Sequence, residues 1–480
     1  MEDSKLWQLT EKLSKPYLRE ATHWVHSPFF NRQEHLARLW AYLLGISRRA
    51  SPRPEYESAF RASFPGEPYD AQKMRLAMSA LYRLLLQFLA YKEQQDNQPL
   101  QLLQQAQALR RLGLEQQAQQ QLQKAQQAND DSPFRDVEHF RLQYEMLEEA
   151  YHYSLRARPD SPAYLQELAD NGDIALLAAK LRQACLTLAH RAVYPAHYQP
   201  GFIEEAIHYI EAKGLRSLPC IELYYFYYYT LKEPRDEQYF LKFRDLLIQE
   251  SRHFPSREAN TLYLLAINYC VRKVNDGFVQ YFGEVMRLYQ EGLKAGHLLE
   301  NGQLSRFTYH NIVATGLRTG DFDWVERFIH EYRAKLERPY RESSFSFCLA
   351  RLEFARQHYE QALPLLQKAN YRDPLLNLAA KTLLIKIYYE TEEFSLLQAH
   401  LEAMRNYIRR KKVIGYHRTN YLNITHYARK LMALAPFDKA GARKLAEAIR
   451  GEDVLTEKAW FLEQLPGPNP GGLNKPTEFG

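Results

Sequence analysis

The most basic segment of the chain lies between residues 401 and 450, which contain 12 Lys or Arg but only 3 Asp or Glu, although the formal net charge of all 480 residues is only +6. Cations near the end of a helix complement its dipole. A larger basic face can also bind an acidic peptide, a nucleic acid or lipid headgroups. We treat six cations as a candidate partner-binding surface, with ordinary solvated helix surface as the simpler interpretation: Arg405, Arg409, Arg410, Lys411, Lys412 and Arg418.

A run of six aromatic residues from Tyr224 to Tyr229 is the most unusual local feature. On a helix, six consecutive aromatic side chains point in every direction, so we expect the run to be buried between neighbouring helices with some hydroxyls on polar partners. The alternative is a surface on which a peptide or nucleic-acid bases stack. Its candidate residues would be Tyr224, Tyr225 and Tyr228, and we favour the core interpretation.

Motifs for catalysis and cofactor binding are absent. The chain has no phosphate-binding loop, dinucleotide-binding glycine motif, zinc-protease motif or serine-hydrolase elbow. Two ExxH pairs, Glu20 with His23 and Glu205 with His208, are too few for a di-iron site. The four cysteines are at least 35 residues apart and form no CxxC pair, so we expect buried thiols. We therefore assign no catalytic residue, cofactor or metal, and an enzyme with a scattered active site is the weakest hypothesis.

The elements that carry these residues are expected to be helices. Leu, Ala, Gln, Glu, Arg and Tyr dominate, and long β-branched runs are nearly absent. Turn signals recur roughly every 15 to 25 residues, which leaves no room for strands. Residues 1–95 read as a separate helical module, in which Asn31 caps a helix ending near Leu44 and a long helix follows Asp70. Residues 94–127 contain 15 glutamines, but their apolar spacing predicts two helices joined at Gly113.

A repeat register appears in the second half of the chain. Phe322, Tyr359 and Phe394 each follow a polar turn residue and are 37 and 35 residues apart, which is the period of a helical hairpin. We expect each to begin the second helix of a hairpin.

Around Tyr359 the sequence resembles the tetratricopeptide repeat. The family's aromatic, small, large, small and proline positions correspond to Tyr359, Ala362, Leu366, Ala369 and Pro374. Leu349 and Ala350 suit its first helix, although its usual Trp and Gly are missing. In the neighbouring copies Val325 and Leu397 replace the small residue, so we expect wider helix spacing there. The resemblance is to divergent repeats and is most specific over 305–450.

These patterns predict an all-α chain, in which a small N-terminal helical module precedes an α-solenoid of tetratricopeptide-like hairpins. The predicted domains are the module at 1–95, the hairpin stack at 96–450, a capping helix with Trp460 and Phe461 at 451–465, and a disordered Pro- and Gly-rich tail at 466–480. No apolar run is long enough to span a bilayer. The first residues lack a secretion signal, so we expect a cytoplasmic protein without membrane insertion.

The favoured functional hypothesis is a non-enzymatic scaffold for protein–protein interaction, because stacked hairpins form a groove that can bind a peptide or helix. Its partner would be a protein or an acidic peptide. The alternative is a nucleic-acid-associated or signalling regulator that uses the basic C-terminal repeats.

Overall fold

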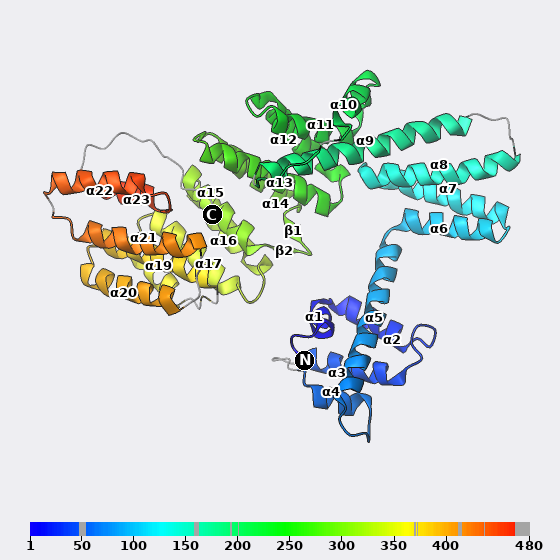
Figure 1. Ribbon diagram of the computed structural model, residues 1–480, viewed down its shortest axis with the longest axis horizontal. Helices are drawn as coiled ribbons and strands as arrows, with labels where there is room; N and C mark the ends of the chain where they lie inside the picture. Colours follow the sequence, from blue (N-terminus) through cyan, green and yellow to red (C-terminus); the bar gives the residue numbers. More distant parts are fainter. Residues whose placement is uncertain are drawn as a thin grey trace. The chain divides into compact units, whose positions relative to one another are not determined.

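The computed structural model describes residues 1–47, 54–157, 163–192, 194–199, 201–368, 371, 373–410, 415–435 and 437–465. Within these ranges the regular structure consists of 23 α-helices, three short 3-10 helices and one pair of two-residue strands (Figure 1). The prediction of an all-α protein is therefore confirmed. No helix in the described part combines the length and apolar character that crossing a membrane requires.

Contacts between residues divide the chain into two compact units. Unit 1 contains Met1–Ser132 and Glu138–Ala175, and unit 2 contains Pro133–Val137 and the chain from Leu176 onward. This division falls at a different place from the predicted domain boundary at residue 95. Helix α9 (Ala163–Arg191) contributes to both units, so the backbone passes from one to the other within a helix.

Unit 1 begins with five helices around their own hydrophobic core, which includes Trp7, Trp40, Phe60 and Leu81. Helix α5 starts after Asp70, whose carboxylate accepts hydrogen bonds from the amides of Gln72 and Lys73, so the helix start follows from a normal N-cap. The helices are α1 (Lys5–Lys12), α2 (Lys15–His26), α3 (Glu34–Ser47), α4 (Tyr56–Ser63) and α5 (Ala71–Asp96).

The predicted N-cap role of Asn31 is wrong. Helix α3 begins three residues later, at Glu34. The Asn31 amide instead donates to the carbonyl of Val25 at 2.8 Å, and its side-chain oxygen accepts from the amide of Gln33 at 2.9 Å. The side chain thus ties the end of α2 to the following loop, a local pairing that competes with helix capping in Asn residues.

The glutamine-rich segment forms the two expected helices, α6 (Gln98–Arg111) and α7 (Glu115–Asp131), joined at Gly113. Gly113 has a φ of +77°, a backbone conformation that favours glycine. Helix α8 (Val137–Ala157) packs with this hairpin through a core that includes Leu103, Leu122 and Met146. Arg110 on α6 pairs with the buried Glu149 on α8 at 2.5 Å.

Unit 2 is a series of helices in which sequence neighbours pack on one another, as in α11 with α12, α13 with α14 and α17 with α18. Helices α15, α17, α19 and α21 also contact one another in that order. Its helices after α9 are α10 (Ile203–Ala212), α11 (Pro219–Lys232), α12 (Glu237–Glu250), α13 (Ser256–Asn275), α14 (Tyr281–Lys294), α15 (Arg306–Thr319), α16 (Phe322–Tyr332), α17 (Arg341–Ala355), α18 (Tyr359–Lys368), α19 (Pro374–Glu390), α20 (Phe394–Arg410), α21 (Gly415–Met432), α22 (Lys439–Gly451) and α23 (Lys458–Glu463). Its 3-10 helices are η1 (Leu215–Ser217), η2 (Ser251–His253) and η3 (Arg333–Lys335).

The predicted repeat register marks real helix boundaries. Phe322, Tyr359 and Phe394 are the first residues of α16, α18 and α20, so this prediction is confirmed. Pro374 begins α19, where proline is tolerated because the first helical amides need no partner within the helix. Ala369 lies outside the described residues.

The expectation of wider spacing next to Val325 overlooked Gly316 on the facing helix α15. A Cβ atom added to Gly316 would lie only 2.3 Å from Cγ2 of Val325. Gly316 is buried, and Val325 is fully buried. The small residue of this contact is therefore on α15 rather than on α16, and the helices remain close without a small residue at position 325.

The expectation that no strands occur is also wrong. Strands β1 (Leu299–Glu300) and β2 (Gln303–Leu304) pair antiparallel. Asn301 and Gly302 connect them, and both have positive φ angles, +51° and +75°. Asn-Gly is a strong signal for such a two-residue turn, and it is present in the sequence.

The predicted capping helix at 451–465 is shorter than expected. Helix α22 ends at Gly451 and α23 begins only at Lys458. We call the intervening segment, Glu452–Glu457, the strap. Trp460 and Phe461 on α23 are buried, as the pattern predicts. Residues 466–480 of the predicted tail lie outside the described residues.

Candidate functional site

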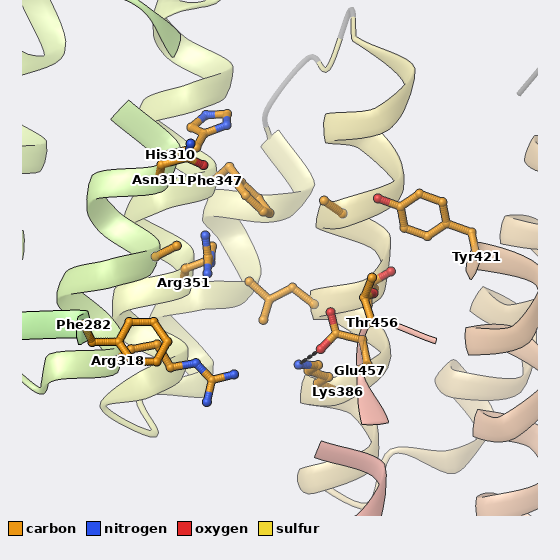
Figure 2. A pocket seen from close by; sticks show the side chains of 14 residues that line it. Phe282, His310, Asn311, Arg318, Phe347, Arg351, Lys386, Tyr421, Thr456 and Glu457 are labelled. Atoms are coloured by element: carbon orange, nitrogen blue, oxygen red, sulfur yellow. Dashed lines mark ion pairs between the residues drawn. The ribbon is translucent and has the colours of Figure 1, made fainter. Parts of the chain in front are cut away.

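A pocket of about 420 Å³ opens among the helices of unit 2 (Figure 2). Its walls come mainly from α15, α17 and α19, with α14, α21 and the strap completing them. This volume falls in the range that holds a small ligand or a peptide side chain. The lining residues are Phe282, His310, Asn311, Ala314, Arg318, Phe347, Arg351, Ala379, Thr382, Leu383, Lys386, Tyr421, Thr456 and Glu457.

Pocket residues on α15, α17 and α19 occupy the same places relative to the start of the following helix. Arg351 and Lys386 each stand eight residues before the aromatic residue that begins the next helix, and Ala314 holds the same place before Phe322. Twelve residues before those aromatics stand His310, Phe347 and Thr382. Positions four apart on a helix share one face. Each pair of these residues therefore lies on one face of its helix, α15, α17 or α19, and that face lines the pocket.

Three cations line the pocket, Arg318, Arg351 and Lys386, and Glu457 is the one carboxylate among the lining residues. Figure 2 shows Lys386 and Glu457 joined as an ion pair. The guanidinium of Arg351 makes no hydrogen bond or ion pair with a described residue, and it lies 5.8 Å from the ring of Phe347. Burial lowers the pKa of Arg351. An arginine nevertheless stays protonated, so it is a cation whose environment favours an added anion.

Glu457 is positioned by hydrogen bonds from α21 to the strap. Asn423 donates to the carbonyl of Val454 at 3.0 Å, and the Thr456 amide donates to the side-chain oxygen of Asn420 at 2.8 Å. Burial raises the pKa of Glu457, but the nearby cations, chiefly Lys386, outweigh burial and lower it overall. The carboxylate is therefore ionised at neutral pH.

His310 supplies an uncharged polar group elsewhere in the pocket wall. Its Nε2 atom is buried and has no hydrogen-bond partner among the described residues. Burial, with help from Arg351 and Arg306, lowers the pKa of His310 to about 4. The ring is therefore neutral at physiological pH.

Together these groups are suited to binding. Phe282, Phe347 and Leu383 supply apolar wall, while the three cations supply polar contacts. The four cysteines are buried. Burial raises the pKa of Cys348, for example, to about 12, and a buried thiol of this kind is a poor nucleophile.

The three tyrosines of the alternative stacking surface are buried in the structure. Tyr224, Tyr225 and Tyr228 are 3%, 6% and 5% exposed. Their hydroxyls donate to glutamates, with Tyr224 contacting Glu258 at 2.5 Å and Tyr225 contacting Glu211 at 2.6 Å. The three rings therefore belong to the core, as the favoured interpretation expects.

The predicted basic surface lies on other helices than the pocket cations. Arg405 is half-buried near the end of α20, whereas Arg409 and Arg410 are exposed at its last turn. Arg418 is exposed in the first turn of α21. Lys411 and Lys412 lie outside the described residues. None of the described members lines the pocket.

Sequence reasoning missed the pocket cations because each is isolated along the chain. The available signal was their spacing from the aromatic helix starts, since Arg351 and Lys386 each lie eight residues before one. Comparison with known proteins adds no further assignment: no family model matches this chain, and no curated protein or solved structure matches it.

Proposed function

We propose that this chain is a non-enzymatic interaction protein that binds an acidic peptide segment of a partner protein. In this proposal α15 to α22 are stacked hairpins related to the tetratricopeptide repeat, and the faces of α15, α17 and α19 form the binding groove. The observation that carries the proposal is the convergence of Arg318, Arg351 and Lys386 on one pocket with a single lining carboxylate.

The chemistry of the walls supports an acidic peptide. A carboxylate matches the planar guanidinium of Arg351 and can accept two parallel hydrogen bonds from it. The apolar wall can cover the aliphatic part of a peptide side chain, while Asn311 offers a polar group for the peptide backbone. A short acidic segment uses both kinds of wall.

Fluorescence anisotropy of a fluorescein-labelled hexaglutamate peptide tests this proposal, with hexaglutamine as the uncharged control. The full chain should bind the acidic peptide saturably, and Arg351→Gln should weaken binding about tenfold, because a charged hydrogen-bond partner contributes roughly 1.5–3 kcal/mol. Arg338→Gln is the matched control, since Arg338 is exposed and does not line the pocket. Equal losses in the two variants would indicate only a general charge effect and would contradict the proposal.

The alternative of a nucleic-acid-associated regulator rests on the exposure of Arg409, Arg410 and Arg418. It predicts binding of labelled DNA or RNA that falls steeply with salt. Arg409→Glu with Arg410→Glu should abolish that binding while Arg351→Gln leaves it intact. This pattern, without saturable peptide binding, would replace the peptide proposal by the nucleic-acid one.

A further inference from the structure

Building on the proposed function, we infer that Glu457 is an internal competitor for the peptide. Its carboxylate takes the place on Lys386 that an acidic side chain of the partner would otherwise occupy (Figure 2). Binding then proceeds by exchange: the incoming carboxylate pairs with Lys386, and the strap carrying Glu457 moves away from the pocket.

The origin of Glu457 in the chain supports this role. The cations of the pocket come from helices α15, α17 and α19, whereas Glu457 comes from the strap between α22 and α23. Its carboxylate is the same chemical group as the side chain of an acidic peptide. The pair is partly open to solvent, with side-chain exposures of 16% for Lys386 and 26% for Glu457, so a solvated carboxylate can reach it.

The strap is held mainly by side chains of α21, so the exchange must break contacts there. Three α21 side chains hydrogen-bond to it: Asn423 donates to the Val454 carbonyl, Asn420 accepts from the Thr456 amide, and the Tyr427 hydroxyl donates to the Glu452 carboxylate at 3.4 Å. The side chain of Leu455 is also buried. A single hydrogen bond contributes about 1 kcal/mol net in water. Trp460 on the following helix is anchored separately, because its indole donates to Glu390 at 2.5 Å. In the exchange that we infer, the hydrogen bonds at Val454 and Thr456 break, while the Trp460 contact keeps α23 in place.

Lys386 is suited to exchanging partners. Its ammonium is a compact charge with three donors on a flexible stem, so it does not require a fixed pairing geometry. The rings of Trp460 and Phe354 lie 5.6 and 6.0 Å from the ammonium. These contacts keep the cation near the pocket after Glu457 leaves.

The test is peptide binding by strap variants of the full chain, with the same hexaglutamate probe. Glu457→Gln removes the competing charge at nearly constant shape and should tighten binding about tenfold. Asn423→Ala removes one hydrogen bond that holds the strap but replaces no residue that lines the pocket. It should tighten binding a few fold. Asp453→Asn is the matched control, because Asp453 is an exposed acid of the same strap that does not line the pocket, and it should leave the affinity unchanged.

Hydrogen exchange on the unmodified chain gives a second readout. Saturating hexaglutamate should accelerate exchange of the Thr456 amide, which loses its bond to Asn420 when the strap moves. If Arg351-dependent binding occurs but Glu457→Gln and Asn423→Ala do not tighten it, and the Thr456 amide stays protected, the exchange inference is wrong while the proposed function stands. If neither the unmodified chain nor Glu457→Gln binds the peptide, both fail.

Discussion

The folded protein favours the deprotonated form of both His310 and Glu457, but for different physical reasons. Burial disfavours the charged imidazolium of His310 and lowers its pKa to about 4. The carboxylate of Glu457 is also penalised by burial, but the neighbouring cations reverse that effect and lower its pKa. Both residues therefore lose their native charge state as the pH falls.

Acidification should destabilise the fold through His310. A histidine in the unfolded chain takes up a proton near pH 6.5, whereas His310 in the fold does so only near pH 4. Between these values the unfolded state binds more protons, so the stabilisation is complete above pH 6.5 and is lost as the pH falls toward 4. The loss from this group reaches up to roughly 3 kcal/mol.

Urea denaturation of the full chain, followed at neutral pH and at about pH 5, measures this effect. His310→Gln cannot take up a proton and should show a smaller fall in the free energy of unfolding than the unmodified chain. His417→Gln, at an exposed histidine, is the control and should fall as much as the unmodified chain does. An equal fall in all three proteins would contradict the role assigned to His310.

At the scale of the element, how closely α15 and α16 pack depends on which helix carries the small residue at their contact. The aromatic residues at the starts of α16, α18 and α20 could be predicted, because turn chemistry and helix starts are signals carried by adjacent residues. The close approach of α15 and α16 could not, since it depends on Gly316 facing Val325 across two helices.

Gly316→Ala should therefore destabilise the protein by about 1–3 kcal/mol, because the added methyl group overpacks the contact with Val325. Thermal or urea unfolding measures the change. Gly283→Ala is the matched control: Gly283 lies in helix α14 with no atom within 4 Å of an added Cβ. It should be neutral or stabilising by up to about 1 kcal/mol. Val325→Ala in the Gly316→Ala background should recover part of the loss, and the absence of recovery would contradict this packing.

At the scale of the whole molecule, the chain forms two compact units, each with large buried side chains of its own. Units with separate cores need not unfold in one cooperative step. We expect differential scanning calorimetry to show two transitions.

Leucine-to-alanine changes should act on one transition each. Leu81 is fully buried in unit 1 and Leu401 is fully buried in unit 2. Replacing either leaves a cavity and should cost about 2–5 kcal/mol. Leu81→Ala should lower the midpoint of one transition and Leu401→Ala that of the other. A single transition that both variants shift equally would show that the units unfold together.

The sequence by itself determined the helical class, the starts of α16, α18 and α20, and the burial of Tyr224, Tyr225 and Tyr228. These features depend on composition and on spacing within one or two turns, so neighbouring residues encode them. The tertiary structure decided the pocket. Arg318, Arg351, Lys386 and Glu457 come from three helices and a strap, and their convergence depends on how those elements pack. That packing is set by distant contacts such as Gly316 with Val325, which no local pattern displays.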